Sequence, residues 1–256
     1  MWIKKQIPNI ITLLNLFCGC IAVIFAVQGH LELTALFVML GIGFDFFDGL
    51  AARLLNAQSE LGLQLDSLAD MVTSGVAPGI VMYQLLSQVF GKPFYVAPGS
   101  WNAEQVMASL DWSYISLLGL LITLSSAYRL ANFNVDTRQT TSFIGLPTPA
   151  NALLVISLPL ILKFQQEAWV IEVILNEWFL VGLTLLSCYL LNAEITLFAL
   201  KFKTWGFAAN KVRYVFLMLT AVLIILLKFI AIPLIILLYI LVSVFFGGKS
   251  TDGEIN

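Results

Sequence analysis

Long apolar stretches recur along nearly the whole chain, and they restrict the fold more than any other feature. Most are about 20 residues long, the length that an α-helix needs to cross the hydrocarbon core of a membrane. Hydrophobic residues make up 60% of the 256 residues and charged residues only 11%, whereas soluble domains carry about 25% charged residues. The sequence therefore predicts an all-α fold, a polytopic integral membrane helical bundle.

The apolar stretches predict six spans in a core over about residues 1–191 and about two more near the C-terminus, all in a single domain over residues 1–256. The first six are Ile10–Val27, Leu33–Leu55, Gly62–Phe90, Trp112–Asn134, Pro147–Phe164 and Ile171–Leu191. The C-terminal pair is expected over about residues 208–247, with a turn near Lys228, Phe229 and Pro233. Two crossings fit that length only tightly, so seven and eight spans both stay open.

The basic residues predict the orientation of this bundle, because Lys and Arg concentrate on the cytoplasmic side of membrane proteins. Of the 13 basic residues, ten fall on one predicted side: Lys4, Lys5, Arg53, Arg129, Arg138, Lys201, Lys203, Lys211, Arg213 and Lys249. The opposite side holds Lys92, Lys163 and Lys228. We therefore expect both termini to face the cytoplasm.

Several familiar kinds of site are not indicated by the sequence. Cys18, Cys20 and Cys188 lie inside apolar stretches without a CxxC or Cys/His pattern, so neither a disulfide nor a zinc site is predicted. The single histidine, His30, lies in a predicted turn, where a histidine is usually just solvated. The net charge is -2, and no basic run indicates nucleic-acid binding.

Four aspartates form the one dense group of charged residues next to the predicted spans. Asp45 and Asp48 are three residues apart near the end of the second span, and Asp66 and Asp70 are four apart at the start of the third. Each spacing places the pair on one helix face, and a short loop between antiparallel helices brings the faces together. Burying four unpaired carboxylates is very costly. We therefore expect one or two divalent cations between them, such as Mg²⁺, Mn²⁺ or Ca²⁺, which all prefer oxygen ligands.

The residues between the two aspartate pairs favour a phosphate-containing ligand. Gly49 and Ala52 have almost no side chain, so a bulky group can approach the backbone there. Arg53 can hold a phosphate through two parallel hydrogen bonds. Solvated aspartates, or aspartates at a helix N-terminus, are the plain alternative, and a cation pathway is another.

The string DFFDGLAAR from Asp45 to Arg53, followed at fixed spacing by Gly62, Asp66 and Asp70, resembles the signature of the CDP-alcohol phosphotransferase family. The resemblance implies that the four aspartates surround metal ions, Mg²⁺ or Mn²⁺, and that Asp70 is the general base. It also implies that Gly49, Ala52, Arg53 and Gly62 hold the cytidine diphosphate part of a lipid donor, and it implies a homodimer in the membrane.

Three further segments look like the phosphatidylserine synthase branch of that family. They are the segments Pro8–Asn15, Arg129–Asn134 and Phe143–Asn151. This likeness implies CDP-diacylglycerol as donor and L-serine as acceptor, with phosphatidylserine and CMP as products. Within these segments, Thr12 and Asn15 are expected at the nucleotide, and Arg129 and Asn132 at serine. For Asn132 the expectation is weaker, because relatives often carry a basic residue there.

Two alternatives remain open from the sequence. One is a sister enzyme whose acceptor is glycerol 3-phosphate, inositol phosphate or an amino alcohol, and a phosphorylated acceptor would need basic residues near the aspartates. The other is a cation transporter, which predicts carboxylates near the membrane midplane in several spans. The apolar stretches away from the aspartates are nearly free of carboxylates, which favours the enzyme.

Overall fold

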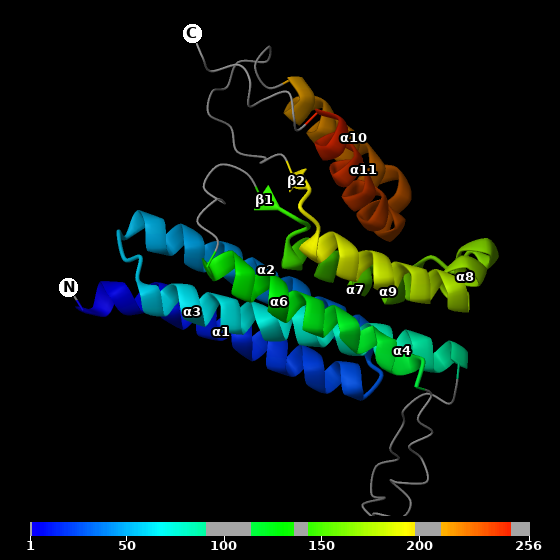
Figure 1. The fold of residues 1–256 in the computed structure, drawn as a ribbon, viewed down its shortest axis with the longest axis horizontal. Coiled ribbons are helices and arrows are strands. Elements are labelled where there is room, and N and C mark those ends of the chain that lie inside the picture. Colours follow the sequence, from blue (N-terminus) through cyan, green and yellow to red (C-terminus); the bar gives the residue numbers. More distant parts are fainter. Residues whose placement is uncertain (1, 91–113, 136–142, 198–210, 247–256) are drawn as a thin grey trace, which may run out of the picture.

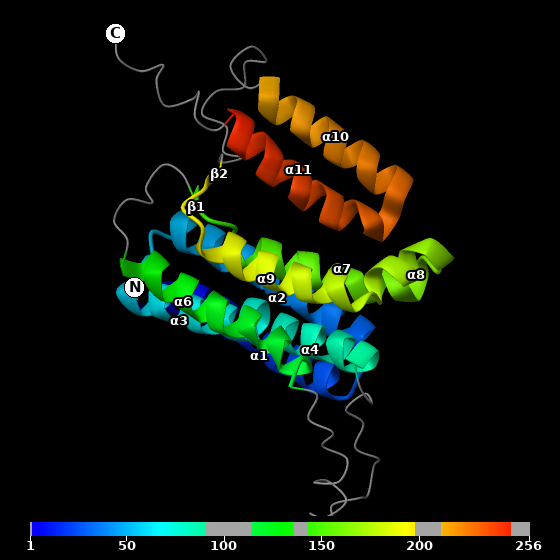
Figure 2. The ribbon, with the colours of Figure 1, turned by 45° about the vertical axis from the view of Figure 1, so that its right-hand side comes forward.

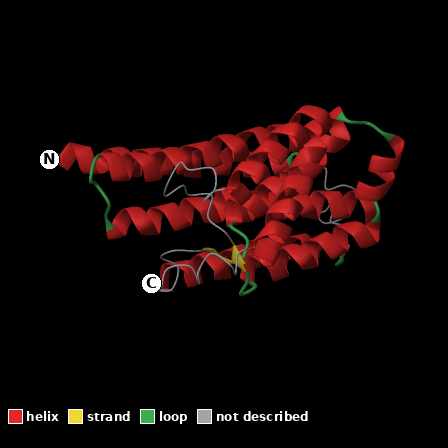
Figure 3. Cartoon of the chain, turned by 90° about the horizontal axis from the view of Figure 1, so that it is seen from above, coloured by secondary structure: helices red, strands yellow, loops and turns green. Residues whose placement is uncertain are grey.

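The computed structural model of the chain describes residues 2–90, 114–135, 143–197 and 211–246. These residues form a bundle of helices that run largely side by side, with a helical hairpin on one flank (Figure 1). Helices account for almost all of the described structure (Figure 3). The all-α prediction is confirmed.

The N-terminal half of the bundle contains α1 (Trp2–Val27), α2 (Leu31–Leu54), α3 (Glu60–Asp70), the π-helical turn η1 (Met71–Val76) and α4 (Ala77–Phe90). Gly29 has a φ of +78° and allows the tight reversal between α1 and α2. Ser59 begins α3, because its hydroxyl accepts a hydrogen bond from the backbone N–H of Gly62 at 3.0 Å. The segments α3, η1 and α4 follow one another without a break, as the predicted third span requires.

The rest of the chain completes the bundle and adds the hairpin. Its elements are η2 (Ser116–Leu120), α6 (Leu121–Val135), β1 (Phe143–Ile144), α7 (Thr148–Phe164), α8 (Ala168–Ile174), α9 (Glu177–Asn192), β2 (Thr196–Leu197), α10 (Lys211–Leu227), η4 (Lys228–Ile230) and α11 (Ala231–Phe246). The prediction of a helix entry at Pro147 is confirmed, since α7 begins at the next residue. The two short strands pair antiparallel, a feature that the sequence did not predict.

The structure corrects the sixth predicted span, and it has the C-terminal turn at Lys228 and Phe229 as predicted. The sixth is a bent pair rather than one helix, because α8 and α9 meet at 58°. At the bend, the side chain of Asn176 accepts hydrogen bonds from the N–H groups of Trp178 and Phe179 and starts α9 as a separate helix. In the C-terminal hairpin the turn is η4, where Lys228 has a φ of +50°. Pro233 lies instead in the first turn of α11, where proline is tolerated.

The outside of the bundle is apolar. Phe17, Phe46 and Ile225 are 61%, 68% and 78% exposed, respectively. The segments Gln6–Val27, Leu31–Leu54 and Arg213–Val244 are long and apolar enough to cross a membrane, and the bent pair α8–α9 qualifies as a fourth. Such a surface suits lipid as its surroundings. The predicted Trp112 and the loop basic residues Lys92, Arg138, Lys201, Lys203 and Lys249 lie outside the described residues.

Candidate active site

Three of the four predicted aspartates meet where the end of α2 passes the start of α3. Asp45 and Asp48 come from α2 and Asp66 from α3, and one carboxylate oxygen of each lies within 4.8 Å of the others. Asp48 is buried, at 6% exposure, and the other two are half-buried. Ser59 and the short loop before it return the chain so that α3 begins beside the end of α2. The antiparallel arrangement expected from the spacing is confirmed.

This carboxylate cluster fits a cation. Like charges at this separation repel, and they are partly removed from water, so a bound positive ion is needed to stabilise them. In addition, Oδ1 of Asp66 is buried and has no hydrogen-bond partner among the described residues. Carboxylate oxygens are the ligands that hard divalent cations prefer. Asp45, Asp48 and Asp66 can therefore hold a metal ion together.

Asp70 lies beside the carboxylate cluster but is not one of its three members. It is one helical turn beyond Asp66, it is 8% exposed, and its charge is close enough to interact with those of Asp45 and Asp66. Its Oδ1 accepts a hydrogen bond from Nδ2 of Asn15 at 3.2 Å. Asp70 therefore lies next to the three grouped carboxylates and is held by a hydrogen bond from α1.

Thr12 connects α1 to the carboxylate cluster. Its hydroxyl donates to Oδ2 of Asp48 at 2.5 Å and also lies 3.1 Å from the carbonyl oxygen of Pro8. The hydroxyl is buried, and a hydrogen bond to a charged acceptor is stronger than one to a neutral acceptor. Thr12 therefore orients one of the three candidate metal ligands.

A cavity of about 520 Å³ opens directly onto the carboxylate cluster. Six of the predicted site residues line it: Thr12, Asp48, Gly49, Ala52, Gly62 and Asp66. The sequence analysis did not assign the others, which are Pro8, Asn9, Ala57, Gln58, Ser59, Glu60 and Leu63. Pro8 and Asn9 belong to the N-terminal segment noted from the sequence, and the remaining five lie between Arg53 and Asp66. Their position between two predicted site residues is the signal that could have identified them.

Gly62 is the clearest steric requirement of the cavity wall. A Cβ atom at this position would lie 3.2 Å from both Oδ1 of Asn9 and Oγ of Ser59. Side chains larger than hydrogen would crowd both polar neighbours and project toward the cavity. The glycine therefore keeps the start of α3 close to α1.

Besides Asp45, Asp70 and Asn15, three more predicted site residues lie outside the cavity lining. Arg53 is exposed, and its Nη2 would lie 3.7 Å from a Cβ atom at Gly49, so the guanidinium folds back along α2. Asn132 is exposed on α6. Arg129 is 8% exposed, and its Nη1 donates to the carbonyl oxygens of Ile144 and Leu191, both at 2.8 Å. The guanidinium of Arg129 thereby ties α6 to β1 and to the end of α9.

Comparison with known proteins identifies the class to which this fold and site belong. The model of the CDP-alcohol phosphatidyltransferase family matches residues 5–188. The chain belongs to this family, and it is a multi-pass membrane protein. The match ends within α9, so α10 and α11 lie beyond it.

Curated relatives narrow the comparison. The chain is 34% identical over 145 residues to the CDP-diacylglycerol–serine O-phosphatidyltransferase of Bacillus subtilis (strain 168). The aligned region covers 57% of this chain and 70% of that protein. It is 32% identical over 151 residues to the enzyme of the same name from Helicobacter pylori (strain J99), covering 58% of this chain and 55% of that protein. An archaetidylserine synthase of Methanothermobacter thermautotrophicus is 30% identical over 154 residues, covering 59% and 56% of the two chains. The matched part is thus little more than half the length of the latter two relatives.

Proposed function

We propose that this protein transfers the phosphatidyl group of CDP-diacylglycerol to the hydroxyl of L-serine, forming phosphatidylserine and CMP. The observation that carries the proposal is the carboxylate cluster at the wall of a cavity lined by the small residues of the signature. The names of relatives in two bacteria and an archaeon, CDP-diacylglycerol–serine O-phosphatidyltransferase and archaetidylserine synthase, support the choice of acceptor. Family membership favours this enzyme over a cation transporter.

The cavity is the proposed place of the cytidine diphosphate group. Gly49, Ala52 and Gly62 leave the backbone open to a flat base and a pyrophosphate. Arg53 lies one turn after Gly49 and is exposed, so its guanidinium is free to turn toward a phosphate when the donor binds. Thr12 faces the same cavity while it holds Asp48.

We propose Mg²⁺ or Mn²⁺ as the cation of the carboxylate cluster. Both ions take carboxylate oxygens, and no softer ligand is part of the cluster. When bound, such an ion neutralises charge on the pyrophosphate and on the departing phosphate. Asp45, Asp48 and Asp66 are the proposed ligands, and Asp70 is proposed as a fourth residue around the metal, as the family signature implies.

Asp70 is proposed as the general base. Its carboxylate accepts the proton of the serine hydroxyl, and the serine oxygen forms a bond to the phosphorus that carries the diacylglycerol. The bond from that phosphorus to the bridging oxygen of the pyrophosphate breaks, and CMP leaves with the electron pair. Burial beside the cluster and the hydrogen bond from Asn15 hold the carboxylate in place for this step.

The serine contacts remain proposals about Arg129 and Asn132. Nη1 of Arg129 donates hydrogen bonds to two backbone carbonyls, which supports a structural role for this residue. A contact with the serine carboxylate would be an additional role. An acceptor with a phosphate group would need several free basic side chains. The names of the relatives support serine over a phosphorylated acceptor.

The distribution of charge and the family resemblance support a proposed orientation and a proposed assembly. The start of α1 and the ends of α2 and α11 lie at one end of the bundle, whereas the end of α7 and the turn between α10 and α11 lie at the other end (Figure 2). Asp45 and Asp48 belong to the end of α2, Lys163 to the end of α7 and Lys228 to that turn. We propose that the aspartate end faces the cytoplasm, with both termini. We also propose a homodimer in the membrane, as the family resemblance implies.

The direct test is turnover by the purified full chain in detergent with CDP-diacylglycerol, Mn²⁺ or Mg²⁺ and labelled serine. The expected result is release of CMP together with a labelled lipid. Reaction with glycerol 3-phosphate or inositol phosphate and none with serine would contradict the proposed acceptor. Ion flux that depends on the aspartates, without CMP release from any alcohol, would contradict the enzyme assignment.

Asp70→Asn tests the proposed base within the same assay. The substitution keeps the size of the side chain but removes the proton acceptor, so we expect turnover to fall by about 10²–10⁴-fold. Retention of the normal elution profile on size exclusion would show that the variant folds. Turnover close to that of the unmodified protein would show that Asp70 is not the base.

A further inference from the structure

Thr73 lies in the π-helical turn that directly follows Asp70, and it is fully buried. Its hydroxyl donates a hydrogen bond to the backbone carbonyl oxygen of Asn15 at 3.2 Å. Asn15, also fully buried, in turn donates from Nδ2 to Oδ1 of Asp70 at 3.2 Å. A closed connection therefore runs from Asp70 along the backbone to Thr73, across to α1, and back to Asp70.

The packing around Thr73 leaves it little freedom. A Cβ atom at Gly41 would lie 2.6 Å from Cγ2 of Thr73 and 2.8 Å from Oδ1 of Asn15. A Cβ atom at Gly19 would collide with the Thr73 hydroxyl. Glycines on both α1 and α2 thus allow these helices to close around one threonine. The π-helical turn brings Thr73 into that space. Such turns are rare overall but occur frequently at functional sites.

We infer that Thr73 is a positioning residue for Asp70 and acts through Asn15. The inference rests on the proposed function, in which Asp70 is the base. Thr73 fixes the backbone of α1 at Asn15, and the Asn15 amide then fixes one oxygen of the Asp70 carboxylate, so the other oxygen has a set direction. A base needs such a direction to meet the acceptor hydroxyl within hydrogen-bonding distance. Asn15 is accordingly assigned to Asp70, and not to the nucleotide expected from the sequence, since it does not line the cavity.

Steady-state kinetics of Thr73→Val and Thr73→Ser test the inference. Valine keeps the shape of threonine and loses the hydroxyl, whereas serine keeps the hydroxyl. For Thr73→Val we expect kcat to fall about tenfold while KM for both substrates changes less than about twofold, because only orientation at the reacting atoms is lost. Thr73→Ser should restore kcat to within about twofold of the unmodified protein.

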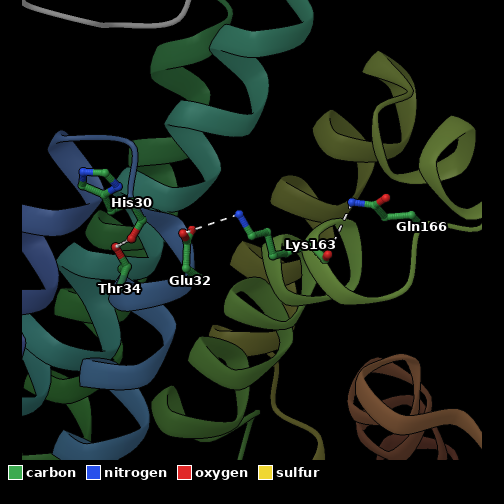
Figure 4. Close-up of polar contacts among 5 residues, drawn as sticks. All are labelled: His30, Glu32, Thr34, Lys163 and Gln166. Atoms are coloured by element: carbon green, nitrogen blue, oxygen red, sulfur yellow. Dashed lines mark hydrogen bonds and ion pairs between the residues drawn. The ribbon is translucent and has the colours of Figure 1, made fainter.

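Thr34→Val is the matched control. Thr34 is fully buried, and its hydroxyl donates to the carbonyl oxygen of His30 at 3.1 Å, at the far end of α2 from the aspartates (Figure 4). Thr34→Val also removes a hydrogen bond from a buried threonine hydroxyl to a backbone carbonyl, but this bond lies at the start of one helix, away from Asp70, so kcat should be unchanged. Equal kcat values for Thr73→Val and Thr34→Val would overturn the inference. So would a Thr73→Ser variant as slow as Thr73→Val, because the hydroxyl would then not be the cause.

The same assays separate this inference from the proposed function. If the unmodified protein uses a different alcohol in place of serine, the proposed acceptor is wrong. Assays of the three variants with that alcohol as acceptor then still decide the role of Thr73. If none of the alcohols tested makes the unmodified protein release CMP, both the proposed function and the role of Thr73 are overturned.

Discussion

The two ends of α2 carry acidic residues in opposite surroundings. Near its start, Glu32 is 38% exposed and lies 3.8 Å from the ammonium group of Lys163, which is 58% exposed (Figure 4). Near its end, Asp45 and Asp48 lie beside another carboxylate, and Asp48 is buried. An exposed ion pair contributes little to stability, whereas grouped buried carboxylates are costly without a cation. The contrast indicates that the aspartates at the end of α2 serve binding and chemistry, whereas Glu32 at its start is an ordinary surface residue.

The largest effect is expected from Asp66→Asn. This change removes one charge from the carboxylate cluster and weakens the proposed metal site, so we expect CMP release to fall by about 10³-fold or more. Glu32→Gln on α2 is the control and should keep full turnover, because Glu32 pairs with a surface lysine at the opposite end of α2 from the aspartates. Similar losses in the two variants would remove the distinction between the ends.

Thr12→Val should have the next largest effect. It removes the hydrogen bond that orients Asp48, and changes to residues that hold a metal ligand typically cost about 10–100-fold in metal affinity or activity. The measurement is the Mn²⁺ concentration that gives half-maximal turnover. Thr184→Val is a suitable control, since Thr184 is fully buried and donates to the carbonyl oxygen of Leu180 at 2.8 Å, in α9. An unchanged Mn²⁺ requirement in Thr12→Val would show that Asp48 needs no such support.

Ala52→Leu tests the cavity beside the carboxylate cluster. The larger side chain enters the space proposed for the cytidine diphosphate group, and we expect KM for CDP-diacylglycerol to rise about tenfold, equal to roughly 1.4 kcal/mol. Ala51→Leu is matched in chemistry and adjacent in sequence, but Ala51 lines an apolar groove with Ile11 and Phe44 instead. The donor KM should be nearly normal in this control. An equal rise in both variants would point to a general disturbance of α2.

The smallest effect is expected at the opposite end. Lys163→Gln removes the ion pair with Glu32, which is exposed and therefore screened by solvent. We expect the free energy of unfolding to change by less than about 1 kcal/mol and turnover to stay the same. Thermal unfolding in detergent, followed by circular dichroism, measures the first quantity. A large loss of stability would show that this end is more than ordinary surface.

The aspartate end could be predicted from the sequence to a large degree, because the spacings of three and four residues fix which side chains share a helix face. The same spacing could not show which aspartates are held by hydrogen bonds from α1. Those bonds depend on how α1 is rotated against α2 and α3, which decides that Thr12 meets Asp48 and Asn15 meets Asp70. Such rotation is set by packing, here by Gly19 and Gly41, and not by local sequence.

Other features escaped prediction for similar reasons. The contacts of Arg129 with Ile144 and Leu191 depend on segments 15 and 62 residues away in the sequence. The π-helical turn has no recognised sequence pattern. The bend between α8 and α9 did carry a signal, since Asn176 followed by Glu177 is typical of a helix start. The apolar residues on both sides concealed it.

The most direct test of the central claim is Mn²⁺ binding to the purified full chain, measured by electron paramagnetic resonance. The unmodified protein should bind Mn²⁺, Asp66→Asn should bind at least about tenfold more weakly, and Glu32→Gln should bind normally. Equal Mn²⁺ binding by Asp66→Asn and the unmodified protein would contradict the claim that the carboxylate cluster is the metal site.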